Sequence, residues 1–211
     1  MARVAPHLRL LDRAEGLAIW RVDGHAVRDR WDVDFTNGHH HYSRRYVPPD
    51  EIWLDREAPG SGEWRFWARH QLVERAAMAA GATYLQALAR ANRAERSLRR
   101  VAPRRERVHR RRLGSAGGRA VWLVDGCAVR TRHHIDFTLG GHGHRYRFIP
   151  RGEIWIDDAV APAERSAIVH HEAVEVELMA AGMSYAAAHA RASAAEVALR
   201  SGRQEGVQSS A

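Results

Sequence analysis

Residues 121–157 read VWLVDGCAVRTRHHIDFTLGGHGHRYRFIPRGEIWID, and they decide the fold because the chain contains this pattern twice. They align without gaps on residues 19–55, with 19 of 37 positions identical. Residues 171–200 align in the same way on residues 70–99, with 16 of 30 positions identical. Identity near one half over two blocks exceeds what shared composition produces. The chain is therefore a tandem duplication of a unit of about 80 residues, the size of a small domain.

Each unit is expected to begin with strands. Apolar runs on both sides of Asp125 and Gly126 predict a β-hairpin with a tight turn. The glycine-rich residues 140–144 predict a loop, because glycine favours turn conformations over strand interiors. Residues 145–149 and 153–156 predict a second hairpin, since a Pro-Arg-Gly turn separates them.

Each unit is expected to end with two helices. Pro162 suits the first turn of one helix, Gly182 suits its end, and Ser184 can cap the second helix. The sequence thus predicts an α+β protein in which a β-β-β-β-α-α unit occurs twice. The expected segments are a first repeat over 14–98, an arginine-rich linker over 99–117, a second repeat over 118–200 and a disordered tail over 201–211.

The charge of the chain is concentrated in the expected linker. All 33 basic residues are arginine, and the formal net charge is +8. Residues 99–112 contain 8 arginines and 1 glutamate, so this segment carries nearly all of the net positive charge. No Phe, Tyr or Trp lies among these arginines to stack on bases. One candidate function is therefore a non-enzymatic protein that binds nucleic acid or an acidic partner weakly, without sequence preference, through this linker.

Composition also indicates the compartment. The single cysteine, Cys127, excludes an internal disulfide and is typical of a reducing environment. No apolar run approaches the roughly 20 residues of a membrane-spanning helix, and the N-terminus has no uninterrupted apolar core typical of a secretory signal. We expect a cytoplasmic protein without a membrane partner.

The helices of the second repeat carry polar residues on the face that should meet the core. His171 and Glu175 lie on the apolar stripe of the first helix, and His189 and Glu196 lie on that of the second. A buried carboxylate is costly unless a partner or a metal compensates it. In an antiparallel pair that turns at Gly182, Glu175 and His189 lie at the same height. His171, Glu175 and His189 are therefore predicted to converge, a set that suits zinc with an open fourth position or non-haem iron.

Residues 171–175, His-Glu-Ala-Val-Glu, resemble the His-Glu-x-x-His helix of zincin metallopeptidases, with glutamate in place of the last histidine. The ligand set is similar to that of the gluzincin branch, which uses two histidines and a glutamate. The resemblance implies that His171, Glu175 and His189 bind the metal and that Glu172 is the general base. It covers about 20 of the 211 residues. It also implies a metal-dependent hydrolase with zinc, or alternatively iron or manganese, and a peptide or another hydrolysable substrate.

The first repeat retains three of the five polar helix positions of the second. The retained pairs are His70 and His171, Glu74 and Glu175, and Glu95 and Glu196. The pairs that differ are Gln71 and Glu172, and Leu88 and His189. On the catalytic interpretation the first repeat is a pseudo-site that has lost its base and third ligand. On the structural interpretation the retained residues form a hydrogen-bonded network common to both repeats.

A third interpretation joins the repeats. If the two helical hairpins form a four-helix bundle, their histidines and glutamates match the ligand composition of di-metal carboxylate proteins. The residues of this set are His70, Glu74, Glu95, His171, Glu175 and Glu196. Outside the helices, His142 in the glycine-rich loop is a separate candidate for binding metal or substrate.

Overall fold

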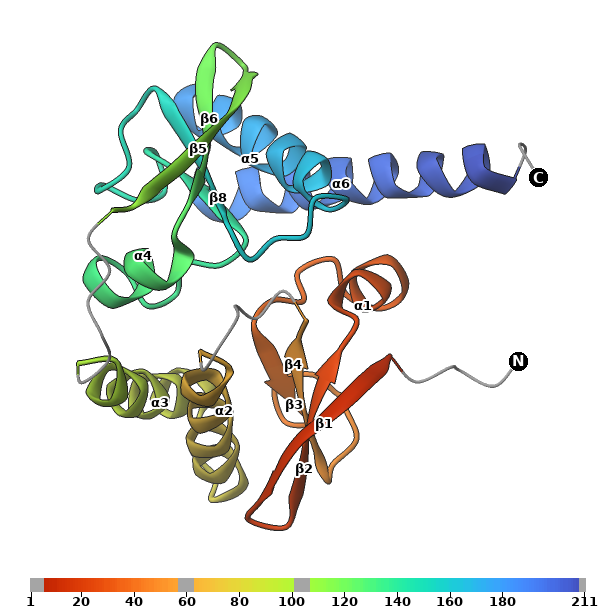
Figure 1. The fold of residues 1–211 in the computed structure, drawn as a ribbon, viewed down its shortest axis with the longest axis vertical. Coiled ribbons are helices and arrows are strands. Elements are labelled where there is room, and N and C mark those ends of the chain that lie inside the picture. The colour runs from red at the N-terminus through yellow and green to blue at the C-terminus, as the bar shows by residue number, and fades with distance from the viewer. Residues whose placement is uncertain (1–5, 57–62, 101–106, 209–211) are drawn as a thin grey trace. The chain divides into compact units, whose positions relative to one another are not determined.

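The computed structural model describes residues 6–56, 63–100 and 107–208, without the side chains of 203–208. The chain divides into two compact units, Met1–Arg104 and Arg105–Ala211. In Figure 1 the first unit runs from red to yellow-green and the second from green to blue. Each unit has a four-stranded sheet and helices that follow it. The predicted α+β architecture and its duplication are confirmed.

The two units have the same order of elements. Unit 1 contains β1 (His7–Ala14), β2 (Leu17–Val22), α1 (Gly24–Arg30), β3 (Gly38–His40), β4 (Glu51–Asp55), α2 (Trp64–Ala79) and α3 (Tyr84–Arg99). Unit 2 contains β5 (His109–Ala116), β6 (Arg119–Val124), α4 (Gly126–Arg132), β7 (Gly140–His142), β8 (Glu153–Asp157), α5 (Arg165–Ala180) and α6 (Tyr185–Gln208).

The sheets also share their topology and register. The strand orders are β1-β2-β4-β3 and β5-β6-β8-β7. In each sheet the two central strands are parallel and both outer strands pair antiparallel with them. Trp20 lies opposite Trp53 in unit 1, and Trp122 lies opposite Trp155 in unit 2. The matching register extends the duplication from the sequence to the backbone.

The hairpin predicted around Asp125 and Gly126 is wrong. Asp125 instead caps α4, because its side chain accepts a hydrogen bond from the backbone N–H of Ala128 at 2.9 Å. An Asp-Gly pair suits both a tight turn and a helix start. The parallel pairing of β6 with β8 decides between them, since parallel strands need a long crossover connection rather than a two-residue turn.

The strands that follow also differ from the prediction. Gly140–His142, expected in a loop, form the short outer strand β7, which pairs with β8. Residues 145–149 form turns rather than a strand, so the second hairpin is also wrong. The glycines of β7 are explained by close neighbours, because a Cβ atom on Gly141 would lie 2.7 Å from the ring of Tyr146.

The predicted linker over 99–117 is largely part of the fold. Arg99 ends α3 and His109–Ala116 form β5, an outer strand paired with β6, while residues 101–106 lie outside the described residues. This strand could not be predicted from the sequence, because most of its side chains are exposed and apolar residues do not alternate along it. Charged residues on an outer strand also oppose edge-to-edge aggregation. Its counterpart, β1, precedes the start predicted for the first repeat.

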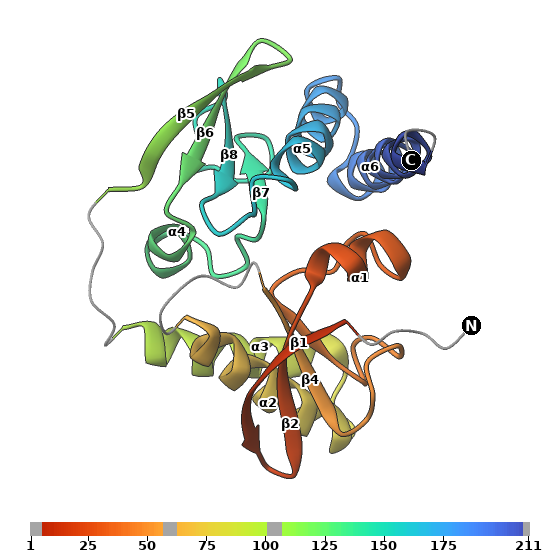
Figure 2. The same ribbon diagram turned by 45° about the vertical axis from the view of Figure 1, so that its right-hand side comes forward.

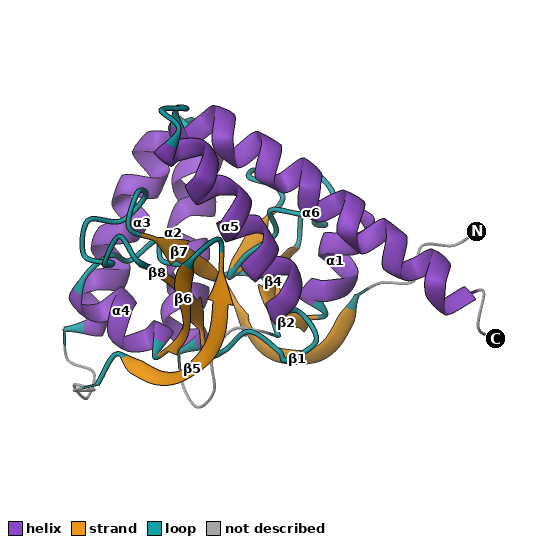
Figure 3. Cartoon of the chain, turned by 90° about the horizontal axis from the view of Figure 1, so that it is seen from above, coloured by secondary structure: helices purple, strands orange, loops and turns teal. Residues whose placement is uncertain are grey.

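The helical hairpins agree with the prediction except at their outer ends. Gly182 lies in the turn after α5 and has a positive φ of 93°. At the start of α6, the side chain of Ser184 accepts a hydrogen bond from the backbone N–H of Ala187. Pro162 lies in the turns before α5, which begins at Arg165. In the segment predicted as a disordered tail, α6 continues to Gln208, and 209–211 lie outside the described residues. Figure 3 shows α6 extending beyond its partner α5.

Both faces of each sheet are covered. In unit 2, α5 packs on one face and α4 with the loops around it on the other, and α6 packs on the outer side of α5 (Figure 2). The core under α5 contains Val121, Leu123, Ile154, Ile156, Ile168 and Val176. The core on the opposite face contains Val124, Val129, Phe137, Tyr146, Ile149 and Trp155. None of the helices in the described residues has the length and apolar character needed to cross a membrane.

Candidate metal centre

A buried chain of ion pairs joins α5 to α6 in unit 2. The Arg200 guanidinium, near the middle of α6, donates to Glu196 at 2.7 and 2.9 Å and to Glu164 at 3.0 Å. Glu164 caps α5, so one arginine joins the start of one helix to the face of the next. All three side chains are at least nine-tenths buried, where a charge requires such partners.

Glu196 extends this chain to His171. The Nδ1 of His171 lies 3.0 Å from Oε2 of Glu196, so Nδ1–H donates to the carboxylate. When this ring gives up its second proton, the lone pair of Nε2 is left on its other side. A carboxylate behind a histidine is the arrangement that orients metal-binding histidines in proteins. Glu196, predicted as an additional ligand, thus lies behind His171 rather than beside the other candidate ligand atoms.

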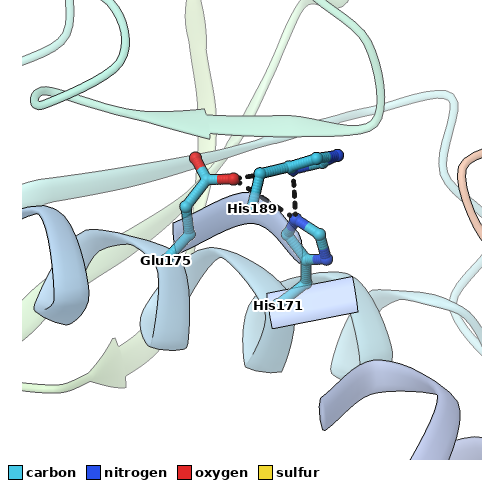
Figure 4. Close-up of side chains that lie close together, drawn as sticks. All are labelled: His171, Glu175 and His189. Carbon is cyan, nitrogen blue, oxygen red and sulfur yellow. Dashed lines mark hydrogen bonds and ion pairs between the residues drawn. The ribbon is translucent and has the colours of Figure 1, made fainter. Parts of the chain in front are cut away.

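Three donor atoms converge on the exposed side of His171 (Figure 4). The Nε2 of His171 lies 3.2 Å from Nδ1 of His189 and 3.5 Å from Oε2 of Glu175. The Nδ1 of His189 lies 2.8 Å from the same Glu175 oxygen. A tetrahedral zinc ion with bonds of about 2.05 Å separates its ligand atoms by about 3.3 Å. The three separations scatter around that value, so one ion fits after a movement of about half an ångström.

The packing of the helices produces this convergence. Ala188 and Ala192 of α6 are fully buried against α5, and such small side chains allow the helix backbones to approach closely. His189 lies between these alanines in sequence, at the height of Glu175. Its side chain is 34% exposed, whereas those of His171 and Glu175 are 9% and 3% exposed. The cluster is therefore open to solvent on the His189 side.

His142 approaches Glu175 from the sheet. The Nδ1 of His142 accepts hydrogen bonds from the backbone N–H groups of His144 and Arg145, at 3.2 and 3.3 Å. The proton of the neutral ring therefore lies on Nε2, which donates to Oε1 of Glu175 at 2.9 Å. A nitrogen that carries a proton cannot bind a metal. His142 thus orients Glu175 so that Oε2 faces the two other histidines.

Glu172 lies on the same side of α5 as Glu175. Its carboxylate is 4.0 Å from Nε2 of His142, and an atom of each of Glu172, His142 and Glu175 lies within 4.8 Å of the others. The backbone of β7 closes over it, because a Cβ atom on Gly140 would lie 3.0 Å from Oε1 of Glu172. Burial and the nearby Glu175 carboxylate, against the opposing charge of His171, together raise the pKa of Glu172 to about 7.

The network also controls the charge of its other members. Burial opposes protonation of His171, but hydrogen bonds to Glu175 and Glu196 outweigh it and raise the pKa of His171 to about 10. Burial opposes ionisation of Glu175, but hydrogen bonds from His142, His171 and His189 outweigh it and hold its pKa well below the usual range. Without a metal, these residues thus share protons. A divalent cation can replace the shared protons, since its ligands must give them up to bind.

Unit 1 contains the same network without the additional ligands. Arg99 donates to Glu95 and Glu63 at 2.7 and 2.6 Å, and Nδ1 of His70 lies 2.9 Å from Glu95. Glu74 lies 3.4 Å from His70 and 3.1 Å from His40, the counterpart of His142.

At the two positions that distinguish the units, unit 1 has Leu88 and Gln71. In the part of the chain that the structure describes, both groups of three candidate metal ligands belong to unit 2. The shared residues therefore form a structural network in each unit, and His189 adds the third donor in unit 2. The histidine–glutamate contacts of each network are made within its own unit, so these contacts do not require the shared di-metal bundle.

Two residues at the rim of the cluster, Tyr185 and Arg145, were not predicted from the sequence as site residues. Tyr185 stacks on His189, with ring centroids 5.4 Å apart, and the Arg145 guanidinium lies 4.3 Å from the centre of the Tyr185 ring. Burial raises the pKa of Tyr185, and the Glu175 carboxylate raises it further, while Arg145 opposes the increase. Arg145 follows β7 and Tyr185 begins α6, so only tertiary packing brings them together.

Comparison with protein family models, with curated proteins and with solved structures found no match.

Proposed function

We propose that unit 2 is a metal-dependent hydrolase that acts on peptide or related amide bonds. A single divalent ion, zinc in the first instance and iron or manganese as alternatives, binds to His171, Glu175 and His189. The observation that carries this proposal is the separation of their three donor atoms, 2.8 to 3.5 Å, on the open side of a histidine that a carboxylate orients. Three protein ligands leave a fourth position for water or substrate.

Glu172 is the proposed general base. Its pKa near neutrality fits a group that must both accept and release a proton at the working pH. A bound zinc ion would polarise the substrate carbonyl and make water more acidic. Glu172 takes a proton from the attacking water, whose oxygen bonds to the carbonyl carbon. The carbon–nitrogen bond then breaks, and Glu172 returns the proton to the leaving nitrogen.

The experiment that tests this function is an assay of the zinc-loaded protein. Hydrolysis is measured with a library of labelled peptides, beside a sample treated with chelator and one reloaded with zinc. We expect cleavage in the loaded samples and none after chelation. Zinc-loaded protein that binds metal stoichiometrically and cleaves no member of the library would contradict the hydrolase proposal.

A second candidate function rests on the exposed arginines of β5. Arg111 and Arg112 are exposed on this outer strand. They support weak contact with nucleic acid or another polyanion, through phosphate contacts that salt disrupts. Replacing both with glutamine should lower binding to labelled DNA at low salt. Binding that survives both high salt and these replacements would contradict this candidate.

A further inference from the structure

The rim of the cluster contains an arginine whose guanidinium is held by aromatic rings. The guanidinium carbon of Arg145 lies 4.3 Å from the centre of the Tyr185 ring and 5.0 Å from that of the Tyr146 ring. Tyr146 is buried and its hydroxyl donates to the backbone oxygen of Asp136 at 3.2 Å. Both rings therefore lie within cation–π distance of the guanidinium.

This arginine is available for an external anion. Within the described residues, no carboxylate lies at ion-pair distance from Arg145, which is exposed. Stacking on aromatic rings leaves the planar edge of a guanidinium able to bind a carboxylate through two parallel hydrogen bonds. A lysine could not make this paired contact.

Unit 1 lacks this arrangement. Ser43 occupies the position of Arg145, and the next residue, Arg44, is bound to Asp32 at 2.5 Å. Tyr46 also donates to Asp32, at 3.0 Å. The counterpart of Asp32 in unit 2 is His134. The acidic partner is therefore absent from that position in the unit that contains the candidate metal ligands.

Arg145 lies close to the candidate metal ligands. Two ring contacts, of 4.3 and 5.4 Å, connect its guanidinium through Tyr185 to the ring of His189. An extended chain advances about 3.5 Å per residue, so a short substrate reaches from the cluster to the guanidinium. His189 is also the most exposed of the three candidate ligands, which places Arg145 on the side open to solvent.

We propose that Arg145, held by Tyr185 and Tyr146, determines specificity by binding a carboxylate of the substrate close to the bond that is cleaved. This inference rests on the proposed function and specifies its substrate class as acidic peptides or peptides with a free C-terminal carboxylate. Tyr185 is a positioning residue, because it joins the arginine to the ring of His189. The expected selectivity for a matched anion is about 10-fold or more, the effect of a hydrogen bond to a charged group.

The test uses the full-length zinc-loaded protein and hydroxamates, which bind zinc through their two oxygens. The probes are the monohydroxamates of succinate, glutarate and adipate, each compared by calorimetry with its uncharged methyl ester. We expect at least one acid to bind about 10-fold or more tightly than its ester. Arg145→Gln should remove this preference and leave the affinity for the esters unchanged. Arg147→Gln, an exposed arginine of the same loop, is the control and should retain the preference.

The possible results separate this inference from the function on which it rests. Equal affinity of the wild type for every acid and its ester, or loss of the preference in Arg147→Gln as well, would overturn the role of Arg145 alone. A protein that binds neither zinc nor any hydroxamate would overturn the proposed function, and this inference with it. Retention of the preference by Arg145→Gln would also overturn the assignment.

Discussion

Nε2 of His171 and Nδ1 of His189 lie 3.2 Å apart, on two different helices, with a Glu175 oxygen near both. Protons or a cation can bridge the two ring nitrogens and this carboxylate oxygen. Because Nδ1 of His171 is bound to Glu196, Nε2 is the ring nitrogen that faces His189 and Glu175. Unit 1 has no such pair, because Leu88 occupies the position of His189.

The first prediction concerns the carboxylate behind His171. Glu196→Gln removes the charge that orients the ring and makes it a better ligand, so zinc affinity should decrease about 10- to 100-fold. Glu95→Gln is the matched control, because it makes the same change in the network of unit 1. Titration with a fluorescent zinc chelator measures both. An equal decrease in the two variants would mean that unit 1 also contributes to the zinc site.

The second prediction concerns Glu172. Glu172→Gln gives unit 2 the residue that unit 1 has at Gln71. The variant should retain zinc but hydrolyse peptides on the order of 100-fold more slowly, because a general base contributes about 10²- to 10⁴-fold. The readouts are kcat and metal content in the same sample. Unchanged kcat in a zinc-loaded variant would exclude Glu172 as the base.

The third prediction is a pH dependence of stability in unit 1. Burial opposes the charge of His70, but hydrogen bonds to Glu74 and Glu95 outweigh it and raise its pKa from 6.5 to about 9. A raised folded pKa means that the contribution of His70 is complete below about pH 6.5 and is lost as the pH rises through about 9. The pKa values of its partners Glu74 and Glu95 are lowered, so both carboxylates are already ionised in this range.

We therefore expect the difference in Tm between the wild type and His70→Gln to decrease between about pH 6.5 and 9. The network of unit 2 is present in both proteins and cancels in the difference. Thermal unfolding followed by circular dichroism across this range measures it. A difference that stays constant, or increases with pH, would mean that His70 is not protonated in the folded protein.

The fourth prediction transfers the site. Leu88→His places a histidine at the position of His189, opposite the His70 and Glu74 pair that unit 1 already contains. This variant should bind a second zinc ion per chain, and addition of Gln71→Glu should not be needed for binding. Elemental analysis after dialysis gives the ratio. Ala89→His, on the exposed neighbouring position, serves as the control and should not increase it.

How much of this structure the sequence predicts depends on how local each interaction is. The convergence expected for Glu175 and His189 requires only helix periodicity and a turn at Gly182, and both are local properties. The prediction at Asp125 is wrong because an Asp-Gly pair suits both a tight turn and the start of a helix. The choice between them depends on pairing with β8, a strand that begins 28 residues further along, at Glu153. The exposed arginines of β5 give no apolar pattern. The contact between Arg145 and Tyr185 depends on how a loop packs against a helix.

The same reasoning explains the role of His142. The sequence around His142 is rich in glycine and does not indicate where its side chain points. The pairing of β7 with β8 directs this side chain toward Glu175. Its two backbone donors then determine which nitrogen carries the proton. A comparison of the repeats in the sequence identifies what unit 2 adds, namely Glu172 and His189. It does not identify which of the shared residues are candidate metal ligands and which residues orient those ligands.

The most direct test of the central claim is the zinc content of the untagged wild-type protein and of His189→Leu, which copies Leu88 of unit 1. Both are loaded with zinc, dialysed and measured by elemental analysis, with folding checked by circular dichroism. We expect one zinc ion per wild-type chain and none in a folded His189→Leu variant. A wild-type protein without stoichiometric zinc, or a variant that retains it, would contradict a zinc site at His171, Glu175 and His189.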